Sequence, residues 1–256
     1  MKNRNPFRII NVSLILIYVI AIWPAAGMAG ASVDNSTFAE LLGKYVQKGM
    51  VDYDGLKKDE ARLDSYLELL ERVDTAELPR DEQFAFYANA YNAWTLKLIL
   101  SGYPGIDSIK DLGSIFKSPW KKKIVRIDGT VLNLDNVEHD ILRPRFKDAR
   151  VHFAINCAAY SCPPLVADPY RGGDLDEQLD AATRQFVNNS KRNYLEGNTL
   201  YVSKIFKWFA EDFDNEPYGF IVHYADGTFK ENLEAAKGRI KVKYLPYDWS
   251  LNNRPQ

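Results

Sequence analysis

"LPRDEQFAFYANAYNAWTLKLILSGYP" (residues 78–104) is the segment on which the architecture of this chain depends. A helix drawn through it has apolar side chains around most of its circumference, and a helix with that pattern is buried. We expect it to begin near Pro79 and to end before Gly102. The pattern therefore predicts a central helix around which the remaining elements pack.

Amphipathic helices are expected on both sides of this segment in the chain. One follows a capping box at Thr37 to Glu40 and stops near Gly49, and a second carries its apolar residues at residues 63–70. A third begins at a capping-box pattern at residues 174–177, and a further aromatic helix is expected within "KIFKWFAEDF" (residues 204–213). Together these patterns indicate a largely helical domain.

Short strands are expected between the helices. The dipeptides Asp128-Gly129 and Gly197-Asn198 each stand between runs typical of hairpin strands. Alternation in residues 151–156 predicts another strand, on which His152 shares a face with Asn156, and a last strand covers residues 240–244. No βαβ rhythm is present. We therefore expect an α+β fold, a single domain with the buried central helix packed with several other helices around small antiparallel sheets.

The N-terminus has the three-part layout of a secretory signal. Basic residues are followed by an apolar run over residues 9–23 and by small residues, with a candidate cleavage site at residues 29–31. We expect residues 1–31 to be a signal peptide, or an anchor if it is not cleaved, and residues 32–256 to form the domain. The predicted location is periplasmic or secreted, with membrane contact only through the N-terminal segment if it is uncleaved.

Charge argues against a nucleic-acid partner. The net charge is −1, and removal of residues 1–31, which carry three basic residues and no acids, leaves −4. A weakly acidic protein has no broad attraction for nucleic acid. Lysines gather around Trp120, either as a solvated strand edge or as an anion site with Trp120 as a platform. The ligand, a small molecule or a peptide, stays unidentified, and no cofactor is indicated.

Buried amides are the first candidates for a site. Asn89 and Asn92 lie on one side of the central helix, and buried amides must find hydrogen-bond partners. Either they hold neighbouring loops against the helix, or they point into a polar pocket and bind substrate.

Both cysteines lie in "VHFAINCAAYSCPPL" (residues 151–165). In an exported protein, Cys157 and Cys162 can form a structural disulfide. Alternatively, one is a nucleophile activated by His152 or, for Cys162, by a short helix opened by Pro163-Pro164. A redox pair is a third possibility, although the spacing is not C-x-x-C.

The remaining histidines and acids add weaker candidates. Glu138 and His139 follow each other on a short helix that Asp135 or Asn136 can cap and that should end before Pro144. They are either a solvated pair or an acid/base couple. Cys157, Cys162, His152 and His139 contain the donor types of a metal site, but no spacing typical of one, so we predict no metal site.

The segments "FAFYANAYNAW", "GSIFKSPW", "LNLDNVEHDILR" and "VHFAINCAAYSCPPL" together resemble the domain of unknown function 547 family. The family pattern is near C-G-x-x-S-C-P. Here Ala158 replaces the glycine, while Ser161 and Cys162 are retained. The resemblance implies an exported bacterial domain, also found in plant and animal proteins beside other modules that include glutaredoxin-like ones. It implies no established activity.

Three functions remain open. In the first, Cys162, or else Cys157, attacks an acyl carbonyl, His152 or His139 transfers the proton with Glu138 nearby, and Asn89, Asn92, Trp120 and Ser161 bind substrate. In the second, a non-catalytic envelope protein with a Cys157–Cys162 disulfide binds a ligand in an aromatic groove formed by Trp120, Trp208 and Trp249. The third is thiol/disulfide exchange.

Overall fold

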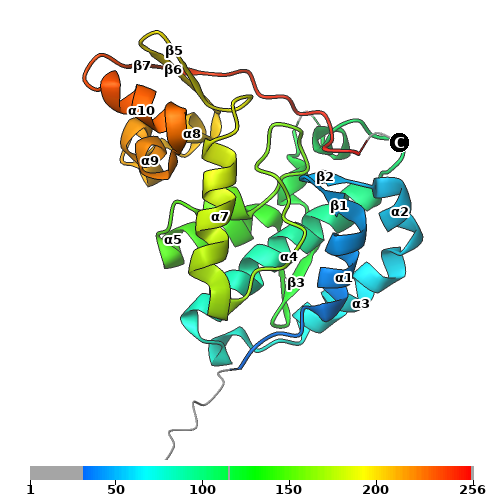
Figure 1. The fold of residues 1–256 in the computed structure, drawn as a ribbon. Coiled ribbons are helices and arrows are strands. Elements are labelled where there is room, and N and C mark those ends of the chain that lie inside the picture. Colours follow the sequence, from blue (N-terminus) through cyan, green and yellow to red (C-terminus); the bar gives the residue numbers. More distant parts are fainter. Residues whose placement is uncertain (1–30, 115, 255–256) are drawn as a thin grey trace, which may run out of the picture.

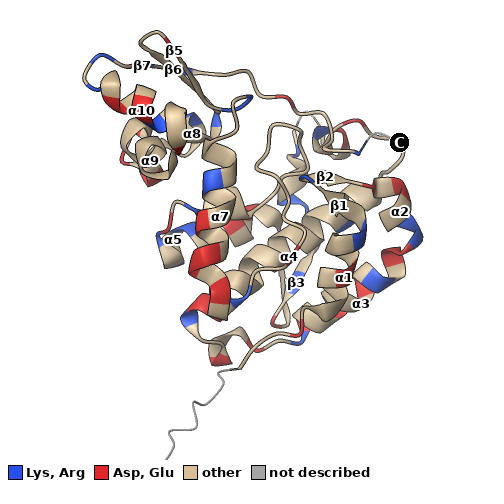
Figure 2. Ribbon diagram, viewed as in Figure 1, with Lys and Arg blue, Asp and Glu red and all other residues tan. Residues whose placement is uncertain are grey.

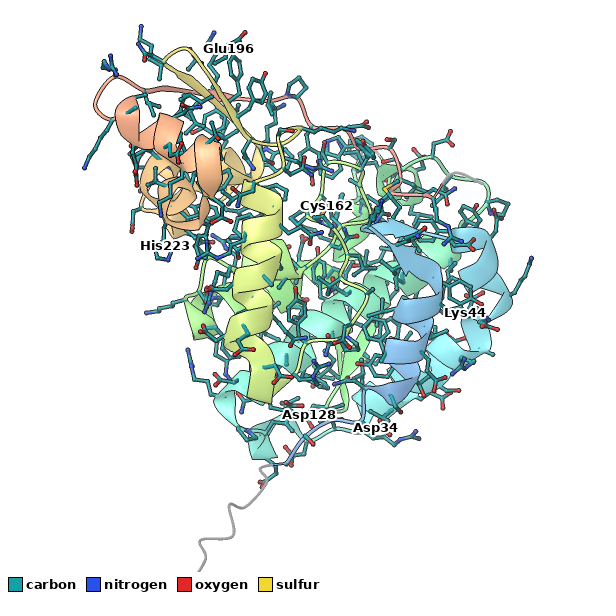
Figure 3. The ribbon with its side chains drawn as sticks, in the orientation of Figure 1. Asp34, Lys44, Asp128, Cys162, Glu196 and His223 are labelled. Atoms are coloured by element: carbon teal, nitrogen blue, oxygen red, sulfur yellow. The ribbon has the colours of Figure 1, made fainter. Side chains whose placement is uncertain are left out.

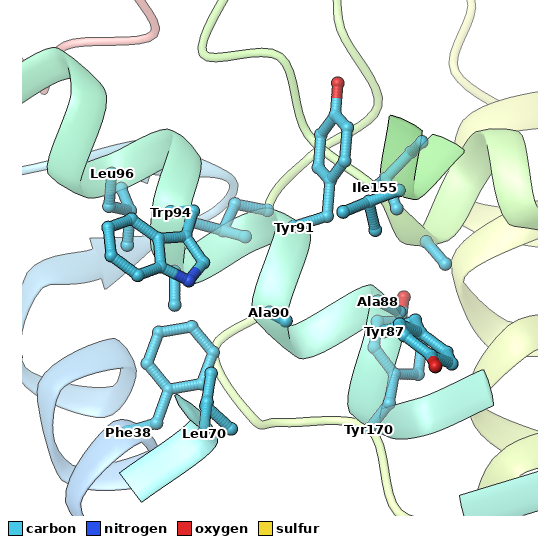
Figure 4. Packing of buried hydrophobic residues seen from close by; sticks show 14 of the residues in the cluster. Phe38, Leu70, Tyr87, Ala88, Ala90, Tyr91, Trp94, Leu96, Ile155 and Tyr170 are labelled. Atoms are coloured by element: carbon cyan, nitrogen blue, oxygen red, sulfur yellow. The ribbon is translucent and has the colours of Figure 1, made fainter. Parts of the chain in front are cut away.

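Helix α4 (Arg80–Leu100) runs through the centre of the protein, as the sequence predicts (Figure 1). The computed structural model describes residues 31–114 and 116–254, so the expected signal segment lies outside the described residues except for Ala31. Nearly all of α4 is buried, and Figure 2 shows it almost free of charged residues, which gather on the outer helices. In Figure 4, Trp94 lies beside Phe38, whereas Tyr91 lies beside Ile155.

The N-terminal part covers one side of the molecule. Its elements are α1 (Ser36–Tyr45), β1 (Val46–Gln47), β2 (Met50–Val51), α2 (Tyr53–Lys58) and α3 (Glu60–Glu71). The capping box expected at Thr37 to Glu40 is absent, because α1 already begins at Ser36 and Glu40 forms an ion pair with Arg62. The helix ends at Tyr45, earlier than expected, because the chain turns there into the antiparallel pair β1–β2.

The middle of the chain contributes short elements that lie against α4. They are η1 (Thr75–Glu77), η2 (Ile109–Leu112), η3 (Pro119–Lys121), β3 (Val125–Ile127), β4 (Thr130–Leu132), the π-helix η4 (Asn136–Leu142) and α5 (Arg143–Phe146). The hairpin β3–β4 is confirmed, with positive φ at both Asp128 and Gly129. The expected end before Pro144 is confirmed for η4, which ends at Leu142. The chain nevertheless stays helical, because α5 begins at Arg143 with Pro144 in its first turn, where proline is tolerated.

The strand expected at residues 151–156 is wrong. Residues Val151–Ala154 form the short helix α6, and the chain becomes extended only at Ile155. All four helical side chains are buried. The alternation in the sequence therefore did not reflect one buried and one solvated face, and periodicity carries no information about a segment buried on every side. His152 and Asn156 consequently do not share the face of a strand.

The C-terminal part packs as a second apolar cluster around Phe186 and Phe206. It comprises η5 (Gly172–Asp174), α7 (Leu175–Val187), β5 (Tyr194–Glu196), β6 (Thr199–Val202), α8 (Ile205–Trp208), η6 (Ala210–Phe213), α9 (Pro217–Tyr224), α10 (Gly227–Ala235) and β7 (Lys241–Tyr244). The cap predicted for α7 is absent, because the Asp174 carboxylate accepts a hydrogen bond from Arg171 instead.

The three small sheets and the surrounding helices confirm an α+β fold in one compact domain. Two sheets are antiparallel hairpins, of which β3–β4 was expected from the sequence and β1–β2 was not. The third is mixed, because β5 and β6 form the expected antiparallel hairpin but β7 pairs with β6 in parallel. None of the described helices is long and apolar enough to span a bilayer.

After β7 the chain returns across the top of the molecule in Figure 1 as an extended strap, residues 245–254, which we call the C-terminal segment. It hydrogen-bonds to two distant parts of the chain. Asn252 accepts from the Val51 amide, and its own amide donates to the Ala158 carbonyl. The C-terminal segment thereby ties the N-terminal hairpin to the loop that carries both cysteines.

Candidate functional site

The loop of residues 156–164, which we call the cysteine loop, is held in place by buried amides. Asn156 donates from its side chain to the Pro163 carbonyl at 2.7 Å and accepts from the Ala158 amide at 2.8 Å. The Asn156 amide in turn donates to the side chain of Asn92 at 2.8 Å, and Asn92 also donates to the Ala154 carbonyl at 3.0 Å. The loop is thus anchored to α4 by side-chain hydrogen bonds at its start.

The same role falls to Asn89, which exchanges two hydrogen bonds with the backbone of Tyr170. Neither Asn89 nor Asn92 lines a cavity around the cysteines. The structure therefore places both amides as supports for loops, the first of the two roles that the sequence allows. Ser161 is also away from the cavity, since its hydroxyl accepts from the Asp248 amide.

Ala158 occupies the glycine position of the family pattern and adopts φ of 60°. This left-handed conformation costs an alanine about 1 kcal/mol or more. Hydrogen bonds to Asn156 and Asn252 fix the backbone on both sides of the residue. The turn expected of a glycine is therefore retained, although the residue is strained.

Both thiols open into one cavity of about 190 Å³ between α4, η4, the cysteine loop and the C-terminal segment. Figure 3 marks Cys162 in the upper part of the molecule. Eight of the site residues proposed from the sequence line this cavity: Trp120, Glu138, His139, His152, Cys157, Cys162, Trp208 and Trp249. The other lining residues are Tyr91, Asp135, Ile155, Pro163, Ile205, Phe209 and Tyr247. Larger surface hollows hold neither thiol, and a smaller one of about 30 Å³ is lined by Cys162 but not by Cys157.

The two cysteines are free thiols and not a disulfide. Cys162 is buried, and its sulfur accepts the backbone N–H of Cys157 at 2.8 Å. Cys157 is partly exposed, and its sulfur lies 3.3 Å from the hydroxyl of Tyr247. No helix follows Pro163, so the expected activation of Cys162 by a helix N-terminus is wrong.

The environments of the thiols drive their pKa values apart. Burial raises the pKa of Cys157, but hydrogen bonds from Cys162, Tyr247 and the Ala159 amide outweigh burial and leave that pKa below its ordinary value. Burial and the neighbouring Cys157 raise the pKa of Cys162 well above its ordinary value. Cys157 is therefore the thiol that ionises first.

Glu138 is the second unusual group in the cavity. Burial, and then the negative charge of Cys157, raise the pKa of its carboxyl to about 8, against smaller opposing effects of Arg143 and Tyr91. At neutral pH this carboxyl mostly keeps its proton. The cavity thus pairs a thiol that ionises readily with a carboxylic acid that does not.

His152 lies behind Glu138 and contacts neither thiol by a hydrogen bond within the described part of the chain. Its Nε2 lies 2.6 Å from Asp212 Oδ2, its Nδ1 lies 4.0 Å from Glu138 Oε1, and its ring stacks on Phe209. Burial lowers the pKa of His152 despite the opposing Asp212. At 4.0 Å this Nδ1 makes no hydrogen bond to Glu138, so a neutral imidazole can exchange a proton with that carboxyl only when the two side chains approach more closely.

Arg143 lies beside both Asp212 and His139. It donates to Asp212 at 2.6 Å, and its guanidinium lies 3.1 Å from Nδ1 of His139. Burial alone would raise the pKa of Asp212, but the hydrogen bonds from His152 and Arg143 leave it below its ordinary value. His139 lines the cavity but is exposed to solvent. Partial burial of its ring, and then the charge of Arg143, lower its pKa against an opposing effect of Asp135.

Five aromatic residues, which we call the aromatic wall, complete the cavity: Trp120, Trp208, Phe209, Tyr247 and Trp249. Ring centroids lie 4.6 Å apart for Tyr247 and Trp249, and 5.6 Å apart for Trp208 and Trp249. All three tryptophans were among the site residues predicted from the sequence, whereas Tyr247 and Asp212 were not. The only available signal was that Asp212 is an acid inside an aromatic helical segment.

A metal centre finds no support among residues 31–114 and 116–254, where no three His, Cys, Asp or Glu side chains come together as ligands. The metal-ligand set considered from the sequence, with Cys157, Cys162, His152 and His139, is therefore not assembled in the described structure.

Comparison with known proteins gives one match. No curated protein and no solved structure matches the chain. Residues 75–187 match the sequence model of a family whose description is "Protein of unknown function, DUF547". This region contains α4, η4 and the cysteine loop, and therefore Glu138, His152 and both thiols. The match over residues 75–187 supports the resemblance to the DUF547 family that the sequence motifs carry.

Proposed function

We propose that this domain is a thiol-dependent acyl-transfer or hydrolytic enzyme with Cys157 as its nucleophile. The observation that carries the proposal is the cavity in which the Cys157 thiol, with its lowered pKa, faces a protonated Glu138. Pairs of titratable groups whose pKa values are driven apart are typical of acid/base catalysis.

Cys157 is preferred to Cys162 on two grounds. It is the more exposed of the two, and its sulfur accepts the hydrogen bonds that stabilise a thiolate. Cys162 is buried with a raised pKa, and its sulfur accepts a backbone N–H that orients the loop. In this proposal Cys162 supports the nucleophile.

The first half of the reaction forms a thioester. The Cys157 thiolate attacks the acyl carbonyl, and the Tyr247 hydroxyl, 3.3 Å from the sulfur, is placed to donate to the developing oxyanion. Burial raises the pKa of Tyr247, so its hydroxyl keeps its proton. The bond to the leaving group then breaks, and the Glu138 carboxyl gives that group its proton.

In the second half, the Glu138 carboxylate takes a proton from water or from an acceptor alcohol or amine. The oxygen or nitrogen so activated attacks the thioester carbonyl, the carbon–sulfur bond breaks, and Cys157 leaves as a thiolate. His152 and Asp212 act through Glu138, because the ring faces that carboxyl at 4.0 Å and is fixed by Asp212 at 2.6 Å. We assign them as positioning residues.

The proposal is tested with p-nitrophenyl acetate as the acyl donor. The full domain should release p-nitrophenolate in a burst equal to the enzyme concentration, and mass spectrometry of a digest should find the acetyl group on Cys157. Cys157→Ala should abolish the burst. Cys162→Ala is the matched control and should keep about a tenth or more of the rate. An acetyl group on Cys162, or a burst that survives in Cys157→Ala, would contradict the assignment.

Thiol/disulfide exchange is a second candidate, favoured by the hydrogen bond from the Cys162 thiol to Cys157. Here Cys157 attacks a disulfide of the substrate, and Cys162 then displaces it, so that the substrate leaves as two thiols and the two cysteines are oxidised to a disulfide. The intact mass after alkylation, with and without prior reduction, separates this case from the first. A bridge that resists strong reductant would instead favour the non-catalytic binding protein.

We also propose that the domain acts outside the cytoplasm, in the periplasm or after secretion, with residues 1–31 as its signal segment. The support is the basic, apolar and small-residue order of that segment. Intact mass of the protein recovered after expression gives the N-terminus directly. A mass that retains residue 1 in a protein recovered from the cytoplasm would refute the proposal.

A further inference from the structure

Asp135 is an acidic residue of the cavity that the proposed reaction does not use. It immediately precedes η4, is partly buried and lines the same cavity as both thiols. Its carboxylate makes no hydrogen bond or ion pair with any described residue, whereas that of the neighbouring Asp140 accepts from Asn136 at 2.6 Å. Asp135 acts on the ring of His139 only at longer range, and no lysine or arginine of the described chain pairs with it.

The aromatic wall faces the same space. Trp208 is 45% exposed although it stacks on Trp249, so part of its surface is open to an incoming group. Rings of this type attract cations through the negative charge of their faces, most strongly in tryptophan. The outer face of Trp249 already holds a cation, because the ammonium of Lys110 lies 3.9 Å from its ring centroid. Lys110 does not line the cavity.

The cavity lining contains no lysine and no arginine, and burial lowers the pKa of both of its histidines, His139 and His152. Arg143 is engaged by Glu211 and Asp212, and Arg192, which is close enough to feel the charge of Cys162 and Tyr247, does not line the cavity. The cavity therefore combines an unpaired carboxylate, tryptophan faces and a volume of about 190 Å³, which suits a small group. An aromatic enclosure with a carboxylate is the arrangement that recognises ammonium groups.

We infer that the cavity binds an organic ammonium group, and that the acyl substrates of this domain carry such a group, held by Asp135 and the aromatic wall. The substrate part of this inference rests on the proposed function, but binding of the cation does not. An anionic substrate is disfavoured, because it would meet Asp135 without any lysine or arginine in the lining.

The test compares choline with 3,3-dimethyl-1-butanol, which has the same shape without the charge. Both are titrated into the Cys157→Ala protein, with tryptophan fluorescence and calorimetry as readouts, so that acyl chemistry plays no part. Choline should bind about tenfold or more tightly than the neutral alcohol. Equal affinities, or no saturable binding of choline, would overturn the inference.

Two variants locate the site. Asp135→Asn should weaken choline about fivefold or more and leave the alcohol unchanged, and Trp208→Ala should weaken choline as well. Asp140→Asn is the matched control on the same helix and should leave choline unchanged, because that carboxylate lies outside the cavity. If Asp135→Asn leaves the affinity for choline unchanged, this site is refuted. Choline binding without an acetyl burst in the wild type would refute the proposed reaction alone.

Discussion

Replacement of Glu138 by glutamine should make the protein more stable at alkaline pH, and the size of the effect follows from its surroundings. In the folded protein, burial and Cys157 raise the pKa of Glu138 from 4.5 to about 8. Below pH 4.5 the carboxyl is neutral in both the folded and the unfolded chain. Between pH 4.5 and about 8 only the unfolded chain ionises, so unfolding releases a proton and stability falls as the pH rises.

Each pH unit in this window lowers the free energy of unfolding by about 1.4 kcal/mol, which amounts to about 5 kcal/mol over the whole window. This is a large part of the total stability of a typical domain. Glutamine has no proton to lose and can still accept the hydrogen bond of Tyr91. Glu138→Gln should therefore lose about 5 kcal/mol less than the wild type between pH 4.5 and 8.

Urea unfolding at pH 5, 6.5 and 8, followed by circular dichroism, measures this difference. Glu82→Gln is the matched control at a second buried glutamate, whose carboxylate accepts backbone N–H groups of Val33 and Gly172. It should lower stability without flattening the pH profile. Parallel profiles for the wild type and Glu138→Gln, within about 1 kcal/mol, would refute the assignment of Glu138 as a neutral acid and with it the proton donor of the proposed reaction.

Three further predictions concern the cysteine loop. Gly49→Ala should destabilise the fold by about 2 kcal/mol or more, because φ is 80° and the new Cβ would lie 2.4 Å from a side-chain carbon of Pro164; Gly43→Ala, in an open helical position, should stabilise by about 0.5–1 kcal/mol in the same urea titration. Asn92→Ala should lower the free energy of unfolding by about 2–4 kcal/mol, because it leaves the Ala154 carbonyl and the Asn156 amide without their hydrogen-bond partners. A decrease below about 1 kcal/mol would contradict its anchoring role. Alkylation of Cys157 by iodoacetamide should rise with pH through a midpoint below the ordinary thiol pKa of 9.0; a midpoint at or above that value would contradict the lowered pKa.

Much of the fold follows from local patterns. The central helix was predictable because 21 residues with apolar side chains on all sides leave no other arrangement that buries them. The hairpin at Asp128-Gly129 was predictable because its two residues adopt positive φ at low cost. Helix α6 was not, since a four-residue segment buried on every side is shaped by its neighbours, here by the Asn92 side chain at its end.

The candidate site was predictable in part for a similar reason. The thiols, Glu138 and His152 lie on segments with recognisable chemistry, and the sequence brings them into consideration together. The sequence did not indicate which of the two thiols has the lower pKa. The lowered pKa of Cys157 depends on hydrogen bonds from Cys162 and from Tyr247, and Tyr247 lies 90 positions away in a segment without periodicity. A hydrogen bond across that separation leaves no local signal.

The division of the site between segments has a physical consequence. The region that matches the family, residues 75–187, supplies the thiols, Glu138 and His152, whereas Trp208, Tyr247 and Trp249 come from beyond it. Tyr247 and Trp249 stay in place because the C-terminal segment hydrogen-bonds to the cysteine loop and to β2. Without that docking the cavity would lose both the hydroxyl donor at the Cys157 sulfur and two rings of the aromatic wall. The acid/base groups and the aromatic wall thus reach one cavity from different parts of the chain. A substitution in the C-terminal segment can therefore change which ligand binds without changing Glu138 or His152.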